Sequence, residues 1–188
     1  MEKTIRMICE KINALPQEQV ILAVDGSCTA GKSTLAARLK VLYDCNVFHM
    51  DDFFLRPEQR TEERFAQPGG NVDYERFREE VLLPLQAQKP FSYRPFSCST
   101  MSLAAPIHVV PRQLSIVEGA YSMHPALSDA YDLSVFLKID AQIQEERILH
   151  RNGCQMQQRF LNEWIPLEKR YFGYFHIENQ CSMSIDVT

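Results

Sequence analysis

The residues best suited to chemistry form a glycine-containing loop directly after an apolar run. Residues 20–24 favour a buried strand, and residues 26–33 fit the pattern GxxxxGK(S/T). In such a loop the backbone N–H groups turn toward phosphate oxygens, and the following helix presents its positive N-terminal end. We therefore predict binding of a nucleoside triphosphate, with Lys32 on the outer phosphates and Ser33 as a Mg²⁺ ligand. The predicted phosphate-binding residues are Gly26, Ser27, Cys28, Thr29, Ala30, Gly31, Lys32, Ser33 and Thr34.

Acidic residues follow two further apolar runs. Residues 45–50 form a short strand candidate, and Asp51 and Asp52 lie just beyond its carboxyl end. Residues 114–117 form another candidate, which ends at Glu118. Ligands of open α/β sheets bind outside the carboxyl ends of the strands. We therefore expect these carboxylates to share one cleft with the glycine-containing loop.

Composition favours one globular domain that binds a small anionic ligand. The chain has 188 residues, which is near the usual size of a single domain. Its net charge is −4, and its Lys and Arg residues are scattered, so we expect no nucleic-acid partner. The six cysteines show no paired spacing, which indicates reduced thiols. No apolar run is long enough to span a membrane, and we expect a cytoplasmic protein without a membrane partner.

The alternation of apolar runs and amphipathic segments predicts a three-layer α/β domain with a parallel sheet. The strand candidates are residues 20–24, 45–50, 114–117, 133–139 and 183–187. The helix candidates are residues 1–15, 32–43, 73–88 and 141–151, with Pro84 expected to kink or shorten the third and Gly153 to end the fourth. Residues 91–110 indicate a hairpin or a binding insertion. Trp164, Tyr171 and Phe172 are expected to pack one helix.

The ordered set of motifs resembles the uridine kinase-like branch of the P-loop kinases, which includes nucleoside, nicotinamide riboside, pantothenate and phosphoribulose kinases. The motifs that carry the resemblance are GSCTAGKST at 26–34, HMDDFFLRP at 49–57, GNVDYERF at 70–77, IVEGAYSMHP at 116–125, FLKID at 136–140 and RILHRNG at 147–153. The resemblance implies a P-loop kinase fold over residues 1–188 with a mostly parallel five-stranded sheet. It also implies a substrate-binding insertion at about 91–110 and a helical lid at about 147–165.

The same resemblance implies roles for the acidic residues. Asp51 corresponds to the general base near the acceptor hydroxyl, and a carboxylate there would orient the nucleophile in line with the γ-phosphate. The neighbouring Asp52 is its rival, and either aspartate could instead cap a turn. Glu118 corresponds to the acidic residue that holds Mg²⁺ beside the hydroxyl of Ser33.

Further residues match the lid and the acceptor site of these kinases. Arg147 and Arg151 resemble lid arginines that stabilise charge in the transition state, although a solvated helix face would show the same spacing. Asp73 matches an aspartate that binds sugar hydroxyls, with helix N-capping as the alternative. Tyr93 matches a uracil-reading tyrosine, Arg94 replaces an acidic neighbour, and Cys98 stands where the family has a histidine.

The motifs together predict a kinase that uses ATP and Mg²⁺ to phosphorylate a hydroxyl of a small, uridine-like or other nucleoside-like metabolite. The donor could instead be GTP. The alternative is a P-loop switch or ATPase, but the guanine-reading (N/T)KxD motif of GTPases is absent. The five histidines, at 49, 108, 124, 150 and 176, lack metal spacing and are expected to be packing or surface residues. Loop N–H groups could lower the pKa of Cys28, although that cysteine fills a variable position.

Overall fold

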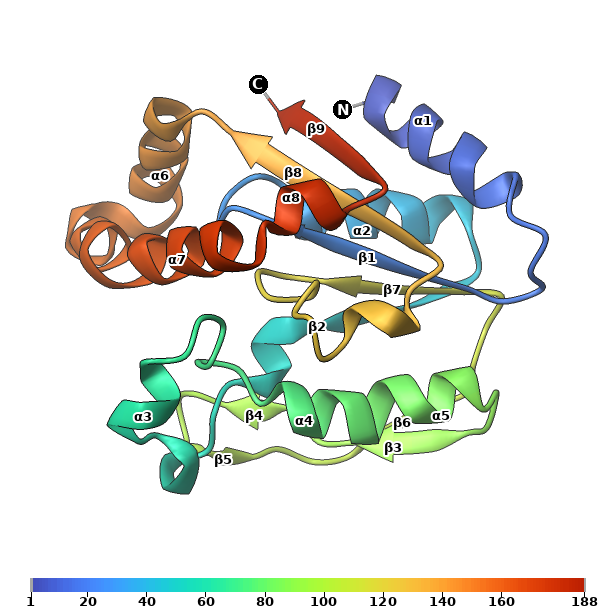
Figure 1. Ribbon diagram of the computed structural model, residues 1–188, viewed down its shortest axis with the longest axis horizontal. Helices are drawn as coiled ribbons and strands as arrows, with labels where there is room; N and C mark the ends of the chain where they lie inside the picture. The colour runs from blue at the N-terminus through green and yellow to red at the C-terminus, as the bar shows by residue number, and fades with distance from the viewer. Residues whose placement is uncertain (1, 188) are drawn as a thin grey trace.

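A five-stranded parallel sheet forms the centre of the molecule. The computed structural model describes residues 2–187, so residue 1, where the first predicted helix starts, lies outside the described residues. The strand order is β2-β7-β1-β8-β9, and every neighbouring pair is parallel (Figure 1). The strands are β1 (Val20–Gly26), β2 (Cys45–His49), β7 (Leu114–Glu118), β8 (Leu133–Ile139) and β9 (Met183–Val187). All five strand predictions are confirmed, and the sheet is wholly parallel.

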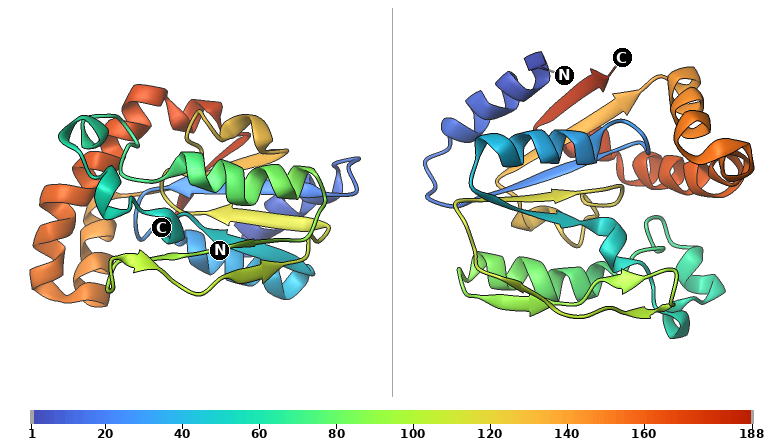
Figure 2. Two further views of the ribbon diagram at one scale, coloured as in Figure 1. Left: turned by 90° about the horizontal axis from the view of Figure 1, so that it is seen from below. Right: turned by 180° about the vertical axis from the view of Figure 1, so that it is seen from behind.

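Helices cover both faces of this sheet and give the three predicted layers (Figures 1 and 2). Leu22 of β1 packs in one hydrophobic cluster with Leu35 of α2 (Lys32–Leu42), whereas the next residue, Ala23, belongs to a second cluster with Tyr171 of α7 (Ile165–Phe175). Successive side chains of a strand point to opposite faces, so a strand buried on both faces needs a continuous apolar run. The helices that cover the sheet are α1 (Glu2–Asn13), α2 (Lys32–Leu42), α7 (Ile165–Phe175) and α8 (Ile177–Gln180).

The carboxyl ends of β1, β2 and β7 meet at one edge of the sheet, on the left in Figure 1. In the strand registers, Glu118 at the end of β7 pairs with His49 of β2 and with Val24 of β1. The chain leaves β1 through the glycine-containing loop into α2, and it leaves β2 through a 3₁₀ turn, Met50–Phe53. The sheet therefore places the loop, Asp51 and Glu118 at the same edge.

The segment predicted as a hairpin or insertion forms two nested antiparallel ladders. Strand β3 (Phe91–Tyr93) pairs with β6 (Ile107–Val109), and β4 (Phe96–Ser97) pairs with β5 (Ser102–Leu103). It packs below the central sheet in Figure 1, beside the helical run that precedes it. The hairpin expectation is confirmed.

Two prolines lie inside helices that continue past them. Before Pro84, α4 (Tyr74–Phe77) runs into a π-helical turn (Arg78–Leu82) and then into α5 (Leu83–Gln86). A second π-helical turn, Phe160–Trp164, precedes Pro166 in α7. Proline lacks an N–H, and its ring clashes with the carbonyl four residues earlier, whereas a π turn has wider spacing. Pro84 therefore does not break the helix, because the wider turn accommodates it.

Gly153 ends the first of two helical segments that follow β8. Helix α6 spans Ala141–Arg159, and Gly153 within it has φ 78° and ψ 169°, a conformation that is essentially restricted to glycine. The prediction that Gly153 ends the helix is confirmed for the first helical segment of α6, and a second segment follows it. Phe160 and Trp164 then pack with Ile148, whereas Tyr171 belongs to the sheet core. The expectation that Trp164, Tyr171 and Phe172 pack one helix holds for Tyr171 and Phe172, which join the sheet core, whereas Trp164 joins the cluster with Phe160.

Two expectations from composition concern the whole chain. All six cysteines are free thiols. Among residues 2–187, no helix combines the length and the apolar character that crossing a membrane requires.

A buried carboxylate joins the sheet to α7. Asp25, at the end of β1, is fully buried and accepts hydrogen bonds from the N–H groups of Gly26 at 2.6 Å and Met123 at 2.9 Å. The buried hydroxyl of Tyr171 donates to the same carboxylate at 2.9 Å. Burial raises the pKa of Asp25, since the charged form is costly away from water. The three donors offset this cost and fix α7 against the loop.

We predict that Tyr171→Phe destabilises the fold by about 1–3 kcal/mol, because it removes one donor from a buried carboxylate. The matched control is Tyr174→Phe on the same helix, where the side chain is 68% exposed. Urea titration gives the free energy of unfolding of each variant. Equal stability of the two variants would show that the bond to Asp25 contributes nothing net.

Candidate functional site

A cavity of about 930 Å³ opens at the carboxyl edge of the sheet. Its walls come from the loop after β1, from the segments after β2 and β7, and from helices α6 and α7. Six of the nine predicted phosphate-binding residues line it, namely Cys28, Thr29, Gly31, Lys32, Ser33 and Thr34. Gly26, Ser27 and Ala30 are not among the lining residues, and Ala30 is fully buried. The cavity also reaches Asp51 and Glu118, so the structure brings the predicted loop and both acids together.

The loop adopts left-handed backbone conformations that turn its N–H groups. Gly26, Thr29 and Gly31 have φ values of 132°, 60° and 93°. A Cβ atom on Gly26 would lie 2.2 Å from the carbonyl oxygen of Leu137, so only glycine fits beside β8. Gly31 is the N-cap of α2, and the first turn of this 11-residue helix faces the cavity. Such a concave run of N–H groups at a helix N-terminus is suited to phosphate oxygens.

Lys32 is folded against the start of its own loop. Its Nζ atom donates to the carbonyl oxygens of Gly26 at 2.7 Å and Ser27 at 2.9 Å. The side chain is largely buried, and its charge opposes the raised pKa values of Asp25, Asp51 and Glu168. Lys32 is thus the cation shared by the carboxylates of the site.

Cys28 is held by two side chains from the C-terminal helices. Its N–H donates to Oε2 of Glu168 at 2.9 Å, and the amide of Gln144 donates to its carbonyl oxygen at 3.1 Å. Burial, followed by the nearby Glu168 charge, raises the pKa of the Cys28 thiol to about 12. The suggestion that loop N–H groups lower this pKa is wrong, because a carboxylate accepts the N–H and the thiol is desolvated. Cys28 is therefore not an activated thiolate.

Asp51 and Glu118 are the two carboxylates at the ends of β2 and β7. Asp51 faces the cavity, and the pKa of its carboxyl is raised first by burial and also by Glu118, against the opposing charge of Lys32. The Glu118 side chain is only 5% exposed. Asp52 is not among the lining residues, and its backbone carbonyl accepts a bond from Arg76. Of the two rival aspartates, only Asp51 lines the cavity.

His49 makes a contact that its sequence spacing did not predict. Its Nδ1 atom lies 2.5 Å from Oε1 of Glu118, across the β2–β7 register. This bond raises the pKa of His49 above its ordinary value, while partial desolvation acts in the opposite direction. The His49 side chain is 48% exposed, which agrees with the expected surface position, and its bond to Glu118 is an additional contact. His124, the histidine closest after Glu118 in sequence, instead stacks on Tyr74 with ring centroids 3.9 Å apart.

The predicted lid arginines both reach the cavity from α6. Arg147 donates to the carbonyl oxygen of Thr29 at 3.2 Å, so it already touches the phosphate loop. Arg151 donates to Asn152 at 2.8 Å, and its guanidinium lies 5.8 Å from the ring of Phe160. Its charge also acts on Asp51. This arrangement differs from a solvated helix face, since both side chains line the same cavity.

The predicted acceptor-binding residues do not converge in the same way. Tyr93 is buried with its ring stacked 5.6 Å from Phe53, and burial raises its pKa to about 12. Arg94 donates to the carbonyl oxygens of Ala104 at 2.7 Å and Leu103 at 2.9 Å, which closes the hairpin. Neither side chain is among those that line the cavity. In the hairpin, Tyr93 therefore packs in the core and Arg94 closes the turn.

Asp73 caps the start of α4, which was the alternative to binding sugar hydroxyls. Its Oδ1 atom accepts from the N–H of Arg76 at 3.1 Å, at the start of α4. Its Oδ2 atom is buried without a hydrogen bond in the described structure and lies 3.5 Å from Nε of Arg76 and 3.7 Å from Nε of Arg56. The structure therefore places Asp73 at a helix start beside two arginines, outside the set of cavity-lining residues.

Other side chains form the part of the cavity beyond Asp51. Phe54, Phe65 and Met101 supply apolar surface, and Asn71 and Arg60 supply polar groups. Arg60 is anchored through Nε to the carbonyl oxygen of Leu55 at 2.9 Å. Among residues 2–187 its guanidinium has no ion-pair partner. This end of the cavity can therefore hold a partly flat, partly polar molecule.

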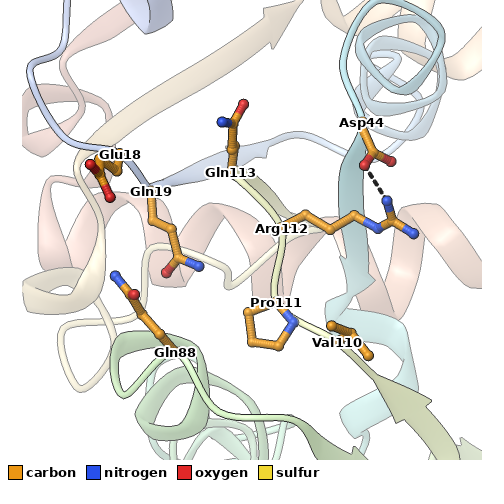
Figure 3. A pocket seen from close by; sticks show the side chains of 8 residues that line it. All are labelled: Glu18, Gln19, Asp44, Gln88, Val110, Pro111, Arg112 and Gln113. Carbon is orange, nitrogen blue, oxygen red and sulfur yellow. Dashed lines mark hydrogen bonds and ion pairs between the residues drawn. The ribbon is translucent and has the colours of Figure 1, made fainter.

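A second hollow lies beside the amino ends of the strands. It is lined by residues such as Gln19, Gln88 and Gln113, and the ion pair of Arg112 with Asp44 crosses one side (Figure 3). Gln19 precedes β1, Gln88 follows α5 and Gln113 precedes β7. Glu18 is its only other charged residue. This hollow lacks the loop, the helix N-terminus and the convergent carboxylates that mark the larger cavity.

The residues of the larger cavity fit a magnesium nucleotide. Mg²⁺ prefers hard oxygen ligands and in nucleotide sites takes only one or two from side chains, with phosphates and waters completing the octahedron. Glu118 and the hydroxyl of Ser33 are of this kind, and both line the cavity with the loop. Within residues 2–187 there is no cluster of three or more His, Cys, Asp and Glu side chains that would hold a metal without such help.

Comparison with known proteins agrees with this geometry. No protein-family model matches the sequence, and no curated protein is significantly similar to it. The structure is similar to that of a possible uridine kinase from Bacillus stearothermophilus, with a TM-score of 0.74 and 20% identity over 99% of this chain and 100% of the other. The chain has the fold of a P-loop kinase.

Two further structures share this P-loop kinase fold. A candidate fructose transport system kinase from Silicibacter has a TM-score of 0.70 and 21% identity over 97% of each chain. A D-glycerate 3-kinase from Cryptococcus neoformans has a TM-score of 0.57 and 15% identity over 90% of this chain and 87% of the other. The fold implied by the uridine kinase-like resemblance is therefore confirmed.

Several residues of the site were not predicted from the sequence. Asp25 could have been found, since it directly precedes the loop in a strand buried on both faces. The pairing of His49 with Glu118 follows from the register of β2 and β7, which only the structure gives. Glu168 and Gln144 carry no such signal, because they reach the loop from helices more than a hundred residues away.

We predict that the pKa of His49 lies above 6.5 and falls in Glu118→Gln, because the carboxylate stabilises the imidazolium. A raised folded-state pKa means that the pair stabilises the fold below the unfolded pKa and loses this contribution as the pH rises through the folded pKa. NMR titration of the imidazole ring protons measures this directly. An unchanged pKa in the variant would contradict the pairing.

Proposed function

We propose that this chain is a kinase that transfers the γ-phosphoryl group of Mg²⁺-ATP to a hydroxyl of a small, nucleoside-like metabolite. One observation carries the proposal. A phosphate-binding loop, a carboxylate after β2, a carboxylate at the end of β7 and two arginines of α6 all line a single cavity. These are the groups that phosphoryl transfer needs, since its catalysis is mostly positioning and charge stabilisation.

The loop and the β7 carboxylate would hold the nucleotide and its cation. Thr29, Gly31, Lys32 and Ser33 line the cavity, and the ammonium of Lys32 lies at the start of the loop, within reach of the outer phosphates. Ser33 and Glu118 would supply oxygen ligands to Mg²⁺, with His49 fixing the Glu118 carboxylate. Held by these residues, Mg²⁺ would supply positive charge that offsets the negative charge developing on the phosphates.

Asp51 would accept the proton of the acceptor hydroxyl. Desolvation and the Glu118 charge raise its pKa, which makes the carboxylate a better proton acceptor than an aspartate with an ordinary pKa. Arg147 and Arg151 would stabilise the charge of the transferred group from the opposite wall.

The part of the cavity beyond Asp51 supports an acceptor with a planar or apolar portion. Phe54, Phe65 and Met101 offer stacking and apolar contacts, and Arg60 and Asn71 offer hydrogen bonds. A nucleoside combines these features with sugar hydroxyls. Because Tyr93 is buried in the core, uracil would have to be recognised by these other residues.

The alternative is a P-loop switch or ATPase without a small-molecule acceptor. The acceptor-side end of the cavity favours the kinase, since a switch has no use for it. Incubation with Mg²⁺-ATP and a panel of nucleosides, pantothenate, glycerate and sugar alcohols separates the two. A phosphorylated acceptor identified by mass spectrometry supports the kinase, and ADP formation that no acceptor stimulates supports the alternative.

We predict that Asp51→Asn lowers kcat for the preferred acceptor by about 100-fold or more, the usual contribution of a positioned general base. The KM for ATP should change little, because Asp51 serves the acceptor. Asp52→Asn is the matched control and should retain most activity. If Asp52→Asn showed the larger loss, the assignment of the base would be reversed.

A further inference from the structure

Glu168 is a carboxylate from a distant helix that accepts a hydrogen bond from the phosphate loop. It lies on α7, is only 7% exposed and accepts from the N–H of Cys28 at 2.9 Å. It also lines the same cavity as Lys32 and Ser33. Loop N–H groups of this kind are donors to phosphate oxygens. A carboxylate oxygen therefore occupies a position suited to an oxygen of the nucleotide.

The bonds of Lys32 place this contact at the outer-phosphate end of the loop. The ammonium of Lys32, which serves the outer phosphates, bonds the carbonyl oxygens of Gly26 and Ser27. The N–H of Cys28 follows directly in the chain. The inner phosphates belong to the other end of the loop, where Gly31 caps α2. The Glu168 carboxylate thus stands where the terminal phosphate of a triphosphate would arrive.

The fold holds Glu168 in this position from two sides. Three residues further along α7, and so on a neighbouring position of the helix surface, Tyr171 donates to Asp25 under the loop. Gln144 of α6 donates to the carbonyl oxygen of Cys28 from the other side. Burial raises the pKa of Glu168, Lys32 opposes this shift, and the Asp25 charge adds to it. The contact is thus built into the site and is not a chance surface bond.

We propose that Glu168 competes with the terminal phosphate of the nucleotide for the Cys28 end of the loop, and so sets the affinity for ATP relative to ADP. A γ-phosphate must displace this carboxylate, since two anionic groups cannot share the same N–H and ammonium without a large repulsion. ADP reaches only the inner part of the loop and leaves the contact in place. The proposal rests on the nucleotide-binding part of the proposed function and not on the identity of the acceptor.

The test compares nucleotide affinities of full-length variants by isothermal titration calorimetry with Mg²⁺ present. The probes are the non-hydrolysable ATP analogue AMP-PNP and ADP. The variants are Glu168→Gln, which keeps the shape and removes the charge, and Glu168→Ala, which removes the contact. The matched control is Glu146→Gln, which removes the same charge from an exposed position on α6. Melting temperatures of the nucleotide-free proteins show that each variant is folded.

Both Glu168 variants should bind AMP-PNP about 10-fold more tightly than the parent, the scale of one competing charge-assisted hydrogen bond. Their affinity for ADP, and both affinities of Glu146→Gln, should be unchanged. A merely structural role would move AMP-PNP and ADP together. Equal shifts, no shift, or weaker AMP-PNP binding would each overturn the inference while leaving the kinase proposal intact. Absence of nucleotide binding in the parent protein would overturn both.

Discussion

The register of three adjacent parallel strands is the constraint on which this site depends. β7 lies between β1 and β2, and Glu118 pairs with Val24 on one side and His49 on the other. Because all three strands run in the same direction, whatever follows each of them emerges at one edge. The loop, Asp51 and Glu118 are thus neighbours through backbone hydrogen bonding, before any side chain is considered. A slip of one residue in β7 would turn Glu118 to the other face of the sheet.

Lys32 offsets the electrostatic cost of this arrangement. Burial raises the pKa values of Asp25, Asp51 and Glu168, and the charge of Lys32 acts against the shift in each. An isolated buried carboxylate would be strongly destabilising, so the site needs this cation even apart from any ligand. The arginines of α6 add positive charge on the opposite wall. The positive charges that balance these carboxylates can therefore also bind a phosphate group.

Local sequence patterns predicted the layers, the strands and the phosphate loop, because each rests on residues adjacent in the chain. A strand that is buried on both faces, such as β1, is recognised by its apolar run. Gly26, which lies against Leu137, is recognised as the first glycine of the loop motif. What the sequence did not reveal depends on long-range packing. Tertiary packing determines three features: the contact of Glu168 with Cys28, the burial of Tyr93 and the turn that accommodates Pro84. No spacing rule encodes such contacts.

A crystal structure with AMP-PNP and Mg²⁺ tests the central claim most directly. The account predicts that the β-phosphate lies against the N–H groups of residues 29–33, with the cation between the phosphates, Ser33 and Glu118. It also predicts that the γ-phosphate faces Asp51. A nucleotide bound elsewhere, or a γ-phosphate directed away from Asp51 with no room for an acceptor between them, would contradict the account.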